Sequence, residues 1–311
     1  MRAQYVSYNP LHYNYIVNEN KMLLHTEQLT KRYGSLTALD RLDIQVAPGE
    51  IVGILGPNGS GKSTALRLLL GFLRPSAGHA TIAGHDCWND SLGARRHVSY
   101  LPGELRLYEN MTGIQLIEFL SDLRQHVLTE RLHKLARLFD IDVQRPLSQM
   151  SSGMKRKIAL MQVLLPETPL VILDEPTNTL DPNMRDQLLG QLSEASQRGQ
   201  GVLFSSHVLT EVEQVCDRVA ILQQGRLVHW ENMRELRQVR HVRMRLSQAV
   251  ETIAPPLGVT ALKASGAELD CSHVGPLPEL LRWLAELPIA DVKIEPMGLA
   301  GIYQKYHKIN E

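Results

Sequence analysis

The chain has 311 residues, which is enough for one large domain with an appendage or for two modest domains. Its hydrophobic share of 43% and its charged share of 21% are those of ordinary globular proteins and exclude a disordered or fibrous chain. The 33 basic and 33 acidic side chains cancel, so the overall charge gives no reason to expect binding to nucleic acid or to an anionic bilayer.

No apolar run approaches the length of a transmembrane helix, and the N-terminal residues lack the charged-then-apolar pattern of a signal peptide. The three cysteines are an odd number without metal or disulfide spacing, which suits a reducing compartment. We therefore expect a soluble cytoplasmic protein.

The first 21 residues differ in composition from the rest of the chain. They contain four of the nine tyrosines, interleaved with asparagines and without helical or strand periodicity. One interpretation is a sticky aromatic arm. The other, which we favour because chain termini are often unordered, is a disordered leader that precedes a start at Met22.

Short apolar strands alternate with helical segments from residue 23 to residue 231, which is typical of a parallel α/β sheet. A hairpin is expected to turn at Gln224 and Gly225, where glycine supplies a positive φ. The expected elements, in chain order, are strands at 23–29, 39–46 and 51–55, a helix at 65–72, a mostly helical stretch at 113–165, strands at 170–173 and 202–204, and a hairpin at 219–230.

Residues 232–311 have a different character and are rich in proline. Short strands at 242–246, at 259–262 and around Ile294 surround one amphipathic helix at 277–287. This pattern predicts a small α+β module, which is too short to be a second enzyme.

The most informative segment lies between the strand 51–55 and the next helix. It satisfies G-x-x-x-x-G-K-[ST], and it has the strand and helix that this pattern needs on either side. Its glycines let backbone N–H groups converge on phosphate oxygens in front of a positive helix N-terminus. We expect Lys62 to reach the β- and γ-phosphates and the Ser63 hydroxyl to bind Mg²⁺. The predicted nucleotide-binding residues of this Gly-rich loop are Gly56, Pro57, Asn58, Gly59, Ser60, Gly61, Lys62, Ser63 and Thr64.

Asp174 and Glu175 follow the buried strand 170–173, at the edge where open α/β sheets bind ligands. Asp174 suits water-mediated Mg²⁺ binding. Glu175 can orient and deprotonate an attacking water, which typically contributes ~10²–10⁴-fold to the rate. The alternative is a pair of acids that marks a helix start before Pro176. Together with the Gly-rich loop, the pair favours a hydrolase over a protein that only binds nucleotide.

Residues 150–157, with the sequence Met-Ser-Ser-Gly-Met-Lys-Arg-Lys, complete the set of motifs. In this order the chain resembles the ATP-binding subunit of an ABC transporter over residues 22–230. Residues 150–154 resemble the family's signature, which is usually Leu-Ser-Gly-Gly-Gln. Ser151, Ser152 and Gly153 head a helix, so a hydroxyl, backbone amides and the helix dipole can hold a γ-phosphate there. Ser151 also suits a simple helix N-cap.

The same resemblance implies roles for three more residues. Tyr33 matches the aromatic residue that stacks on adenine. Asp181 closes a loop, residues 178–181, that touches the opposite subunit across a head-to-tail dimer. His207 ends the third buried strand and matches the switch histidine that contacts the γ-phosphate and couples it to the catalytic Glu175.

Three departures from the family pattern concern the site. The family usually has a glutamine that senses Mg²⁺ and contacts the membrane partner after the Tyr-x-Pro segment, but here Gly103 and Glu104 follow Pro102. Either Glu104 takes over as a metal ligand or that contact is absent. Ser152 and Met154 replace a glycine and a glutamine of the signature, as in the drug and polysaccharide exporter branch. Thr179 replaces a customary glycine, which leaves the backbone geometry of its loop open.

The resemblance implies an α/β fold of the P-loop NTPase class and the ABC ATPase type. Such a fold has a parallel core sheet, an antiparallel β subdomain and a helical subdomain. We predict that the ATP-binding domain spans residues 22–231 and that the small α+β module spans residues 232–311.

The implied activity is Mg²⁺-dependent ATP hydrolysis in a homodimer, or in a dimer with a paired ATPase subunit. ATP would lie between residues 56–64 of one subunit and residues 151–153 of the other. An integral membrane permease encoded separately, docked around residues 104–124, would hold the protein at the cytoplasmic face of the cell membrane. Residues 295–303 resemble the end of the exporter branch, so export is the expected direction, and no nucleic-acid partner is expected.

Two other functions stay open from the sequence. One is an ABC ATPase that acts on ribosomes or DNA, although such relatives usually have two cassettes, coiled coils or zinc-binding inserts. The other is a regulatory subunit that does not hydrolyse ATP. Intact Glu175 and His207 argue against the second alternative, and Gly103 keeps it open.

Overall fold

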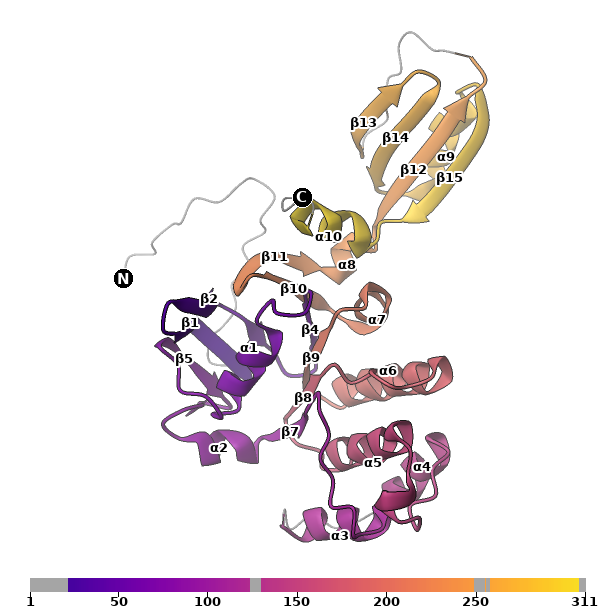
Figure 1. Cartoon of the computed structure of the whole chain (residues 1–311). Coiled ribbons are helices and arrows are strands. Elements are labelled where there is room, and N and C mark those ends of the chain that lie inside the picture. The colour runs from indigo at the N-terminus through magenta and orange to yellow at the C-terminus, as the bar shows by residue number, and fades with distance from the viewer. Residues whose placement is uncertain (1–21, 124–129, 249–254, 256–257, 308–311) are drawn as a thin grey trace.

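The computed structural model describes residues 22–123, 130–248, 255 and 258–307 (Figure 1). The predicted leader at residues 1–21 lies outside these residues. Three sheets organise the described chain. The helices are α1 Lys62–Leu69, α2 Ser91–Arg96, α3 Gly113–Leu123, α4 Glu130–Leu138, α5 Ser152–Leu164, α6 Pro182–Gln197, α7 Leu209–Val215, α8 Met233–Leu236, α9 Leu277–Ala285 and α10 Leu299–His307, with a 3₁₀ turn at Leu147–Gln149.

The central sheet has six strands in the order β11-β10-β4-β9-β8-β7. All neighbouring pairs are parallel except the hairpin of β10 and β11, which is antiparallel. Its turn contains Gln224 and Gly225, both at positive φ, as the sequence predicts. The strands are β4 Ile51–Leu55, β7 Val98–Leu101, β8 Leu170–Asp174, β9 Gly201–Ser206, β10 Arg218–Gln223 and β11 Arg226–Asn232.

The inner strands β4, β8 and β9 of this sheet are buried on both faces, which explains why they are largely apolar in sequence. In β4, Val52 and Ile54 join one apolar cluster, whereas Ile51 and Leu55 join another on the opposite face. Helix α1 and the second sheet cover the first face, and α5, α6 and α7 cover the second (Figure 1). The parallel strands therefore end at one shared edge that helices flank on both sides.

The second sheet is antiparallel and has the order β2-β1-β5-β6, with β3 also paired to β1. It packs against α1 and corresponds to the expected antiparallel subdomain. Its strands are β1 Leu24–Tyr33, β2 Leu36–Leu42, β3 Gln45–Val46, β5 Ala77–Ile82 and β6 His85–Asp86. Helices α3, α4 and α5 form the expected helical subdomain (Figure 1). The fold class predicted from the sequence is confirmed.

The third sheet has the order β13-β14-β12-β15 and forms its own apolar core with α9. Its strands are β12 Val239–Leu246, β13 Val259–Ser265, β14 Glu268–Val274 and β15 Ile289–Pro296. Along β12 and β14, buried residues alternate with more exposed ones, so one face of the sheet packs on α9. The sequence predicted this α+β module without β14 and α10.

Helices α8 and α10 flank this module in sequence but pack on the larger core. Met233, Leu236 and Leu299 are buried in the same apolar cluster as α6 and α7. The backbone N–H of Leu299 donates to Glu213 of α7, and the ring of Tyr306 stacks on His229 of β11 at a centroid distance of 5.3 Å. The separate apolar core therefore lies between β12 and β15, whereas α8 and α10 belong to the larger core.

Among the residues that the structure describes, no helix is long and apolar enough to cross a bilayer.

A substitution in α9 tests whether the β12–β15 module unfolds independently. Leu280 is fully buried in the core of this module, so Leu280→Ala is expected to lower the free energy of unfolding of the module by about 2–5 kcal/mol. Hydrogen-exchange mass spectrometry in a urea series should show earlier loss of protection in β12, β14 and α9 but not in α1 or α5. The matched control is Leu281→Ala, because Leu281 is 47% exposed and its truncation should change little. Equal destabilisation of α1 would show that the two cores unfold together.

Candidate functional site

The Gly-rich loop connects β4 to α1, as its sequence pattern requires. Gly59 and Gly61 have φ values of 81° and 105°, a left-handed region that side chains disfavour. A Cβ on Gly56 would lie 2.4 Å from the carbonyl oxygen of Leu222. Helix α1 begins at Lys62, three residues before the predicted start, and its N-cap Gly61 makes no side-chain capping bond. The first backbone N–H groups of α1 are therefore available to an anion.

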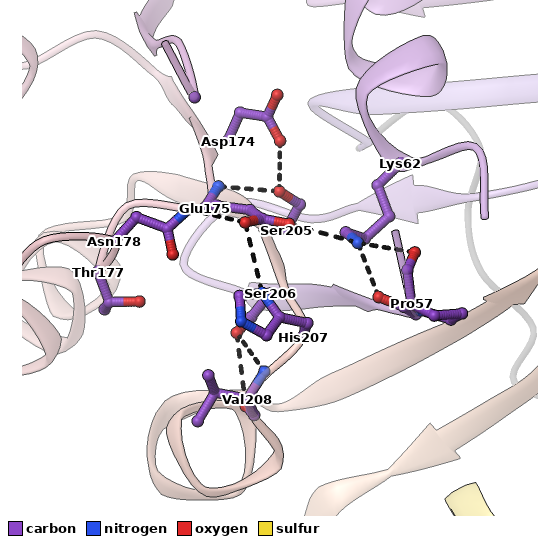
Figure 2. Close-up of polar contacts among 12 residues, drawn as sticks. Pro57, Lys62, Asp174, Glu175, Thr177, Asn178, Ser205, Ser206, His207 and Val208 are labelled. Atoms are coloured by element: carbon purple, nitrogen blue, oxygen red, sulfur yellow. Dashed lines mark hydrogen bonds and ion pairs between the residues drawn. The ribbon is translucent and has the colours of Figure 1, made fainter. Parts of the chain in front are cut away.

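Lys62 is 5% exposed and is surrounded by oxygen atoms (Figure 2). Its Nζ donates to the carbonyl oxygens of Gly56 at 2.7 Å and Pro57 at 3.1 Å, and it lies 3.4 Å from Oε1 of Glu175. Phosphate oxygens are acceptors of the same kind. The hydroxyl of Ser60 is buried in this loop without a hydrogen-bond partner among the described residues. Phosphate oxygens can replace the carbonyl oxygens that Lys62 contacts, and they can accept from the unsatisfied Ser60 hydroxyl. Both features fit a phosphate-binding loop.

Asp174 ends β8 beside Ser205 of the neighbouring strand β9. The Ser205 hydroxyl donates to Oδ1 of Asp174 at 2.6 Å and accepts from the backbone N–H of Glu175 at 2.9 Å (Figure 2). Glu175 has a φ of 45°, and non-glycine residues in this region cost about 1–3 kcal/mol unless the surroundings hold them. Ser205 thus fixes the orientation of both acids at the end of the strand.

The Glu175 carboxylate lies between two basic groups. Its Oε1 is near Lys62, and its Oε2 lies 3.3 Å from Nδ1 of His207 and accepts from Nδ2 of Asn178 at 2.8 Å. Burial acts to raise the pKa of Glu175, but the Asn178 hydrogen bond and the charges of Lys62 and His207 outweigh it, so the pKa lies below its usual value. The carboxylate is therefore ionised at neutral pH and can accept a proton from water.

The donor set at this edge suits Mg²⁺. Asp174 supplies a carboxylate and Ser63, in the first turn of α1, supplies a hydroxyl. Among the described residues there is no group of three or more His, Cys, Asp or Glu side chains that could hold a metal by themselves. Mg²⁺ commonly uses one or two protein oxygens together with substrate phosphates and water, so two hard oxygens beside a phosphate loop fit this ion.

Gly103, rather than Glu104, lies next to the predicted metal site. A Cβ on Gly103 would be 3.4 Å from Oδ2 of Asp174, so a side chain at residue 103 would begin in contact with this carboxylate. Glu104 is exposed and makes no hydrogen bond or ion pair with another described residue. Its predicted role as a metal ligand has no contact in this structure to support it.

Ser151 caps α5, and its Oγ accepts from the backbone N–H of Met154 at 3.2 Å. Ser151 and Ser152 are exposed, so the N-terminus of α5 faces outward. Helix α5 packs on the opposite face of the central sheet from α1 (Figure 1). The two predicted anion-binding segments, residues 56–64 and 151–153, therefore lead into helices on opposite faces of the central sheet.

The loop before α6 contacts the start of α5. Thr179 has a φ of 69°, so it keeps a glycine-like backbone despite its branched side chain. A Cβ on Gly153 would lie 3.3 Å from the carbonyl oxygen of Thr179, which brings this loop against the signature segment. Asp181 caps α6, because its Oδ1 accepts from the backbone N–H of Met184 at 2.9 Å.

Tyr33 lies at the end of β1 in the antiparallel sheet and is 48% exposed. The Nζ of Lys31 lies 5.0 Å from the centre of its ring. The ring is therefore available for stacking, which suits the predicted contact with adenine.

Sequence reasoning missed a buried carboxylate behind the site. Glu211 of α7 is 2% exposed and accepts hydrogen bonds of 2.9 Å from the hydroxyls of Thr177 and Ser206. Arg185 of α6 lies 3.1 Å from its other oxygen. This network joins the segment after Glu175 to the residue before His207. The signal in the sequence was the pair Ser205 and Ser206 at the end of the otherwise apolar strand β9, because buried hydroxyls need hydrogen-bond partners.

Ser205→Ala tests whether β9 orients the acids of β8. The variant leaves the Glu175 N–H and one Asp174 oxygen without their partner, at a cost of about 1–3 kcal/mol. We expect lower stability in urea unfolding and, for the nucleotide hydrolysis that the sequence predicts, a rate about 10–100-fold lower. Ser193→Ala is the matched control, since the Ser193 hydroxyl donates to the Leu189 carbonyl within α6 and to no other described residue. An unchanged rate for Ser205→Ala would remove Ser205 from this role.

Comparison with known proteins matches the motifs. A family model described as ABC transporter matches residues 39–178. The daunorubicin/doxorubicin resistance ATP-binding protein DrrA of Streptomyces peucetius is 30% identical over 290 residues, which cover 89% of this chain and 88% of that protein.

Two solved structures have the same fold. The structure of an ATP binding subunit of an ABC transporter has a TM-score of 0.64 at 30% identity and covers 69% of this chain and 92% of that one. The dimeric structure of a bacterial ABC transporter cassette has a TM-score of 0.62 at 21% identity and covers 68% of this chain and 98% of that one.

Proposed function

The chain belongs to the family of ABC transporter ATP-binding proteins, and we propose that it hydrolyses ATP to drive export through a separate membrane permease. The observation that carries the proposal is the position of Glu175. Its carboxylate lies between Lys62 of the Gly-rich loop and His207 at the end of β9. A base next to a phosphate-binding lysine is what water attack on a phosphate requires.

Binding of ATP is supported by the loop and its helix. Lys62 exchanges its bonds to the Gly56 and Pro57 carbonyls for the β- and γ-phosphates, and the N–H groups at the start of α1 hold the α- and β-phosphates. Ser63 and Asp174 would hold Mg²⁺, which would neutralise negative charge on the phosphates. Tyr33 stacks on the adenine ring.

Hydrolysis then depends on the freed Glu175. Once Lys62 binds phosphate, the Oε1 of Glu175 is free to accept a proton from the attacking water. Asn178 keeps the carboxylate oriented through Oε2, and His207 donates to the γ-phosphate at the other side of the same carboxylate. Ser205 keeps Glu175 and Asp174 in place during this exchange.

A head-to-tail dimer is supported by the separation of the two anion-binding segments. Residues 56–64 and 151–153 flank opposite faces of one central sheet, so one chain does not close them on a single nucleotide (Figure 1). The exposed N-terminus of α5 from a second copy can complete the site with Ser151, Ser152 and backbone N–H groups. The loop that ends at Asp181 lies beside this segment and faces the same partner. A similar bacterial cassette is a dimer.

A permease dock is supported by an apolar groove of about 210 Å³ between α3, α5 and the segment after β7. Its wall includes Leu105, Leu107, Leu120 and Val163. Beside it, the exposed rings of Tyr108 and Phe119 meet edge to face at 6.2 Å. Exposed aromatic side chains beside an apolar groove suit a helix from a partner protein. This groove overlaps the dock expected at residues 104–124, and a permease bound there would hold the chain at the cytoplasmic face of the membrane.

Export is supported by the similarity to DrrA, a drug-resistance ATP-binding protein, over most of both chains. That similarity extends beyond the ATPase motifs into the C-terminal module, because it covers 89% of this chain.

Glu175→Gln is the direct test of hydrolysis. The amide keeps the shape of the side chain but accepts no proton, so kcat should fall by ~10²–10⁴-fold while ATP still binds. Light scattering should show an ATP-dependent dimer that persists in this variant. Glu194→Gln, an exposed change on α6, is the control. Wild-type turnover in Glu175→Gln would contradict the proposal.

Phe119→Asp tests the dock. Phe119 is 41% exposed, so a charge there should leave folding and basal ATPase activity intact. It should lower the affinity for a partner that buries this ring by roughly tenfold or more. The measurement is co-sedimentation with inverted membrane vesicles from the cells that carry the gene. Leu92→Asp, at a side chain that is 70% exposed on α2, is the control. Co-sedimentation of Phe119→Asp at the wild-type level would exclude this groove as the dock.

A further inference from the structure

Arg156 is the most completely bonded side chain near the site, and none of the predicted roles includes it. It lies on α5, is 3% exposed, and directs its guanidinium at the ends of β7 and β8. Its Nη1 donates to the carbonyl oxygens of Pro102 at 3.0 Å and Gly103 at 2.9 Å. These two residues follow β7 and lead into the wall of the apolar groove.

The other donors of Arg156 reach the catalytic strand. Nη2 donates to the carbonyl oxygens of Asp174 at 3.1 Å and of Glu175, and Nε donates to that of Pro176 at 3.2 Å. All five N–H donors of the guanidinium are therefore used, and each acceptor is a backbone carbonyl. The planar fork of arginine can bridge two strand ends in this way, which the single ammonium of lysine cannot do.

Two backbone features depend on this bridge. Glu175 has a φ of 45°, and its carbonyl oxygen bonds to Arg156 while its N–H bonds to Ser205. Gly103 has no side chain to contact the acids, but its carbonyl oxygen accepts from the same guanidinium that bonds to the carbonyls of Asp174 and Glu175. The guanidinium therefore links the backbone of residues 102–103 to the backbone that carries Asp174 and Glu175.

We propose that Arg156 is a positioning residue that transmits movement between the groove segment after β7 and the catalytic acids at the end of β8, through backbone carbonyls alone. This inference rests on the proposed function, because it assumes that the acids act on ATP. Nucleotide bound beside Asp174 and Glu175 then shifts the groove, and a partner in the groove shifts the acids. By linkage, the two effects are equal in free energy.

The experiment uses a dye on the groove of the full-length chain. Phe119→Cys supplies an exposed thiol, whereas the three native cysteines are buried. Burial raises the pKa of Cys87 to about 12 and that of Cys271 to about 11, so these thiols should stay unlabelled near neutral pH. An environment-sensitive fluorophore is attached to the introduced thiol, and the labelled chain is titrated with a non-hydrolysable ATP analogue and Mg²⁺.

We expect the fluorophore to respond to the analogue in the otherwise unchanged chain. With Arg156→Lys added, the analogue should bind with an affinity within about threefold, the fluorescence change should disappear, and kcat should fall by up to about 100-fold at a similar KM. A substitution that merely weakened packing would lower stability without separating binding from the groove signal. Arg131→Lys is the control, because Arg131 is a partly buried arginine that pairs with Glu167, which precedes β8 at the opposite end from the acids.

Each outcome decides the proposal. A response that survives in Arg156→Lys overturns it, and so does an analogue that binds without any response in the labelled Phe119→Cys chain that retains Arg156. If Arg156→Lys does not fold, Arg156→Gln takes its place in the test of the fluorescence response. The absence of a response in the labelled chain that retains Arg156 still overturns the proposal. A chain that fails to bind the analogue at all refutes the proposed function, which is a distinguishable result.

Discussion

The ion pair between Lys62 and Glu175 is the contact on which the account of the site depends. It joins the Gly-rich loop after β4 to the acid that follows β8, across the intervening strand β9. The pair exists because parallel strands that are buried on both faces end at one edge. A charge pair that is largely removed from water is costly unless its remaining donors and acceptors are satisfied. Here the Gly56 and Pro57 carbonyls, Asn178 and His207 supply those partners.

The same pair explains how the resting site is stabilised and how a nucleotide changes it. Phosphate oxygens compete with Glu175 for Lys62, so binding of the nucleotide releases the base for its reaction. Ser205 and Arg156 hold the backbone of Glu175 from two sides while this exchange takes place. The network around Glu211 holds the neighbouring segments at Thr177 and Ser206. These buried polar contacts therefore tie the backbone of Glu175 to the ends of the neighbouring strands β7 and β9 while the Lys62 side chain changes partners.

The sequence predicted the parts of the site that local pattern determines. The Gly-rich loop and the acids 174–175 lie where they do because a buried strand and a turn place them, and both features are visible in the order of apolar residues. Arg156, Ser205 and Glu211 were missed because most of their partners are distant along the chain. The partners of Arg156 are 18 to 54 residues away, and those of Ser205 are 30 to 31 residues away. Those of Glu211 are 5 and 34 residues away. Only the packing of α5 and α7 against β7, β8 and β9 brings these groups together. Likewise α10 could not be placed on α7, because its contact with Glu213 spans 86 residues.

The central claim is tested most directly by a crystal structure of the full-length Glu175→Gln variant with ATP and Mg²⁺. The account predicts that the Nζ of Lys62 leaves the Gly56 and Pro57 carbonyls and binds the phosphates, and that Ser151 of a second copy closes on the same nucleotide. A nucleotide bound while Lys62 keeps its present carbonyl partners, or one held by a single copy, would contradict it.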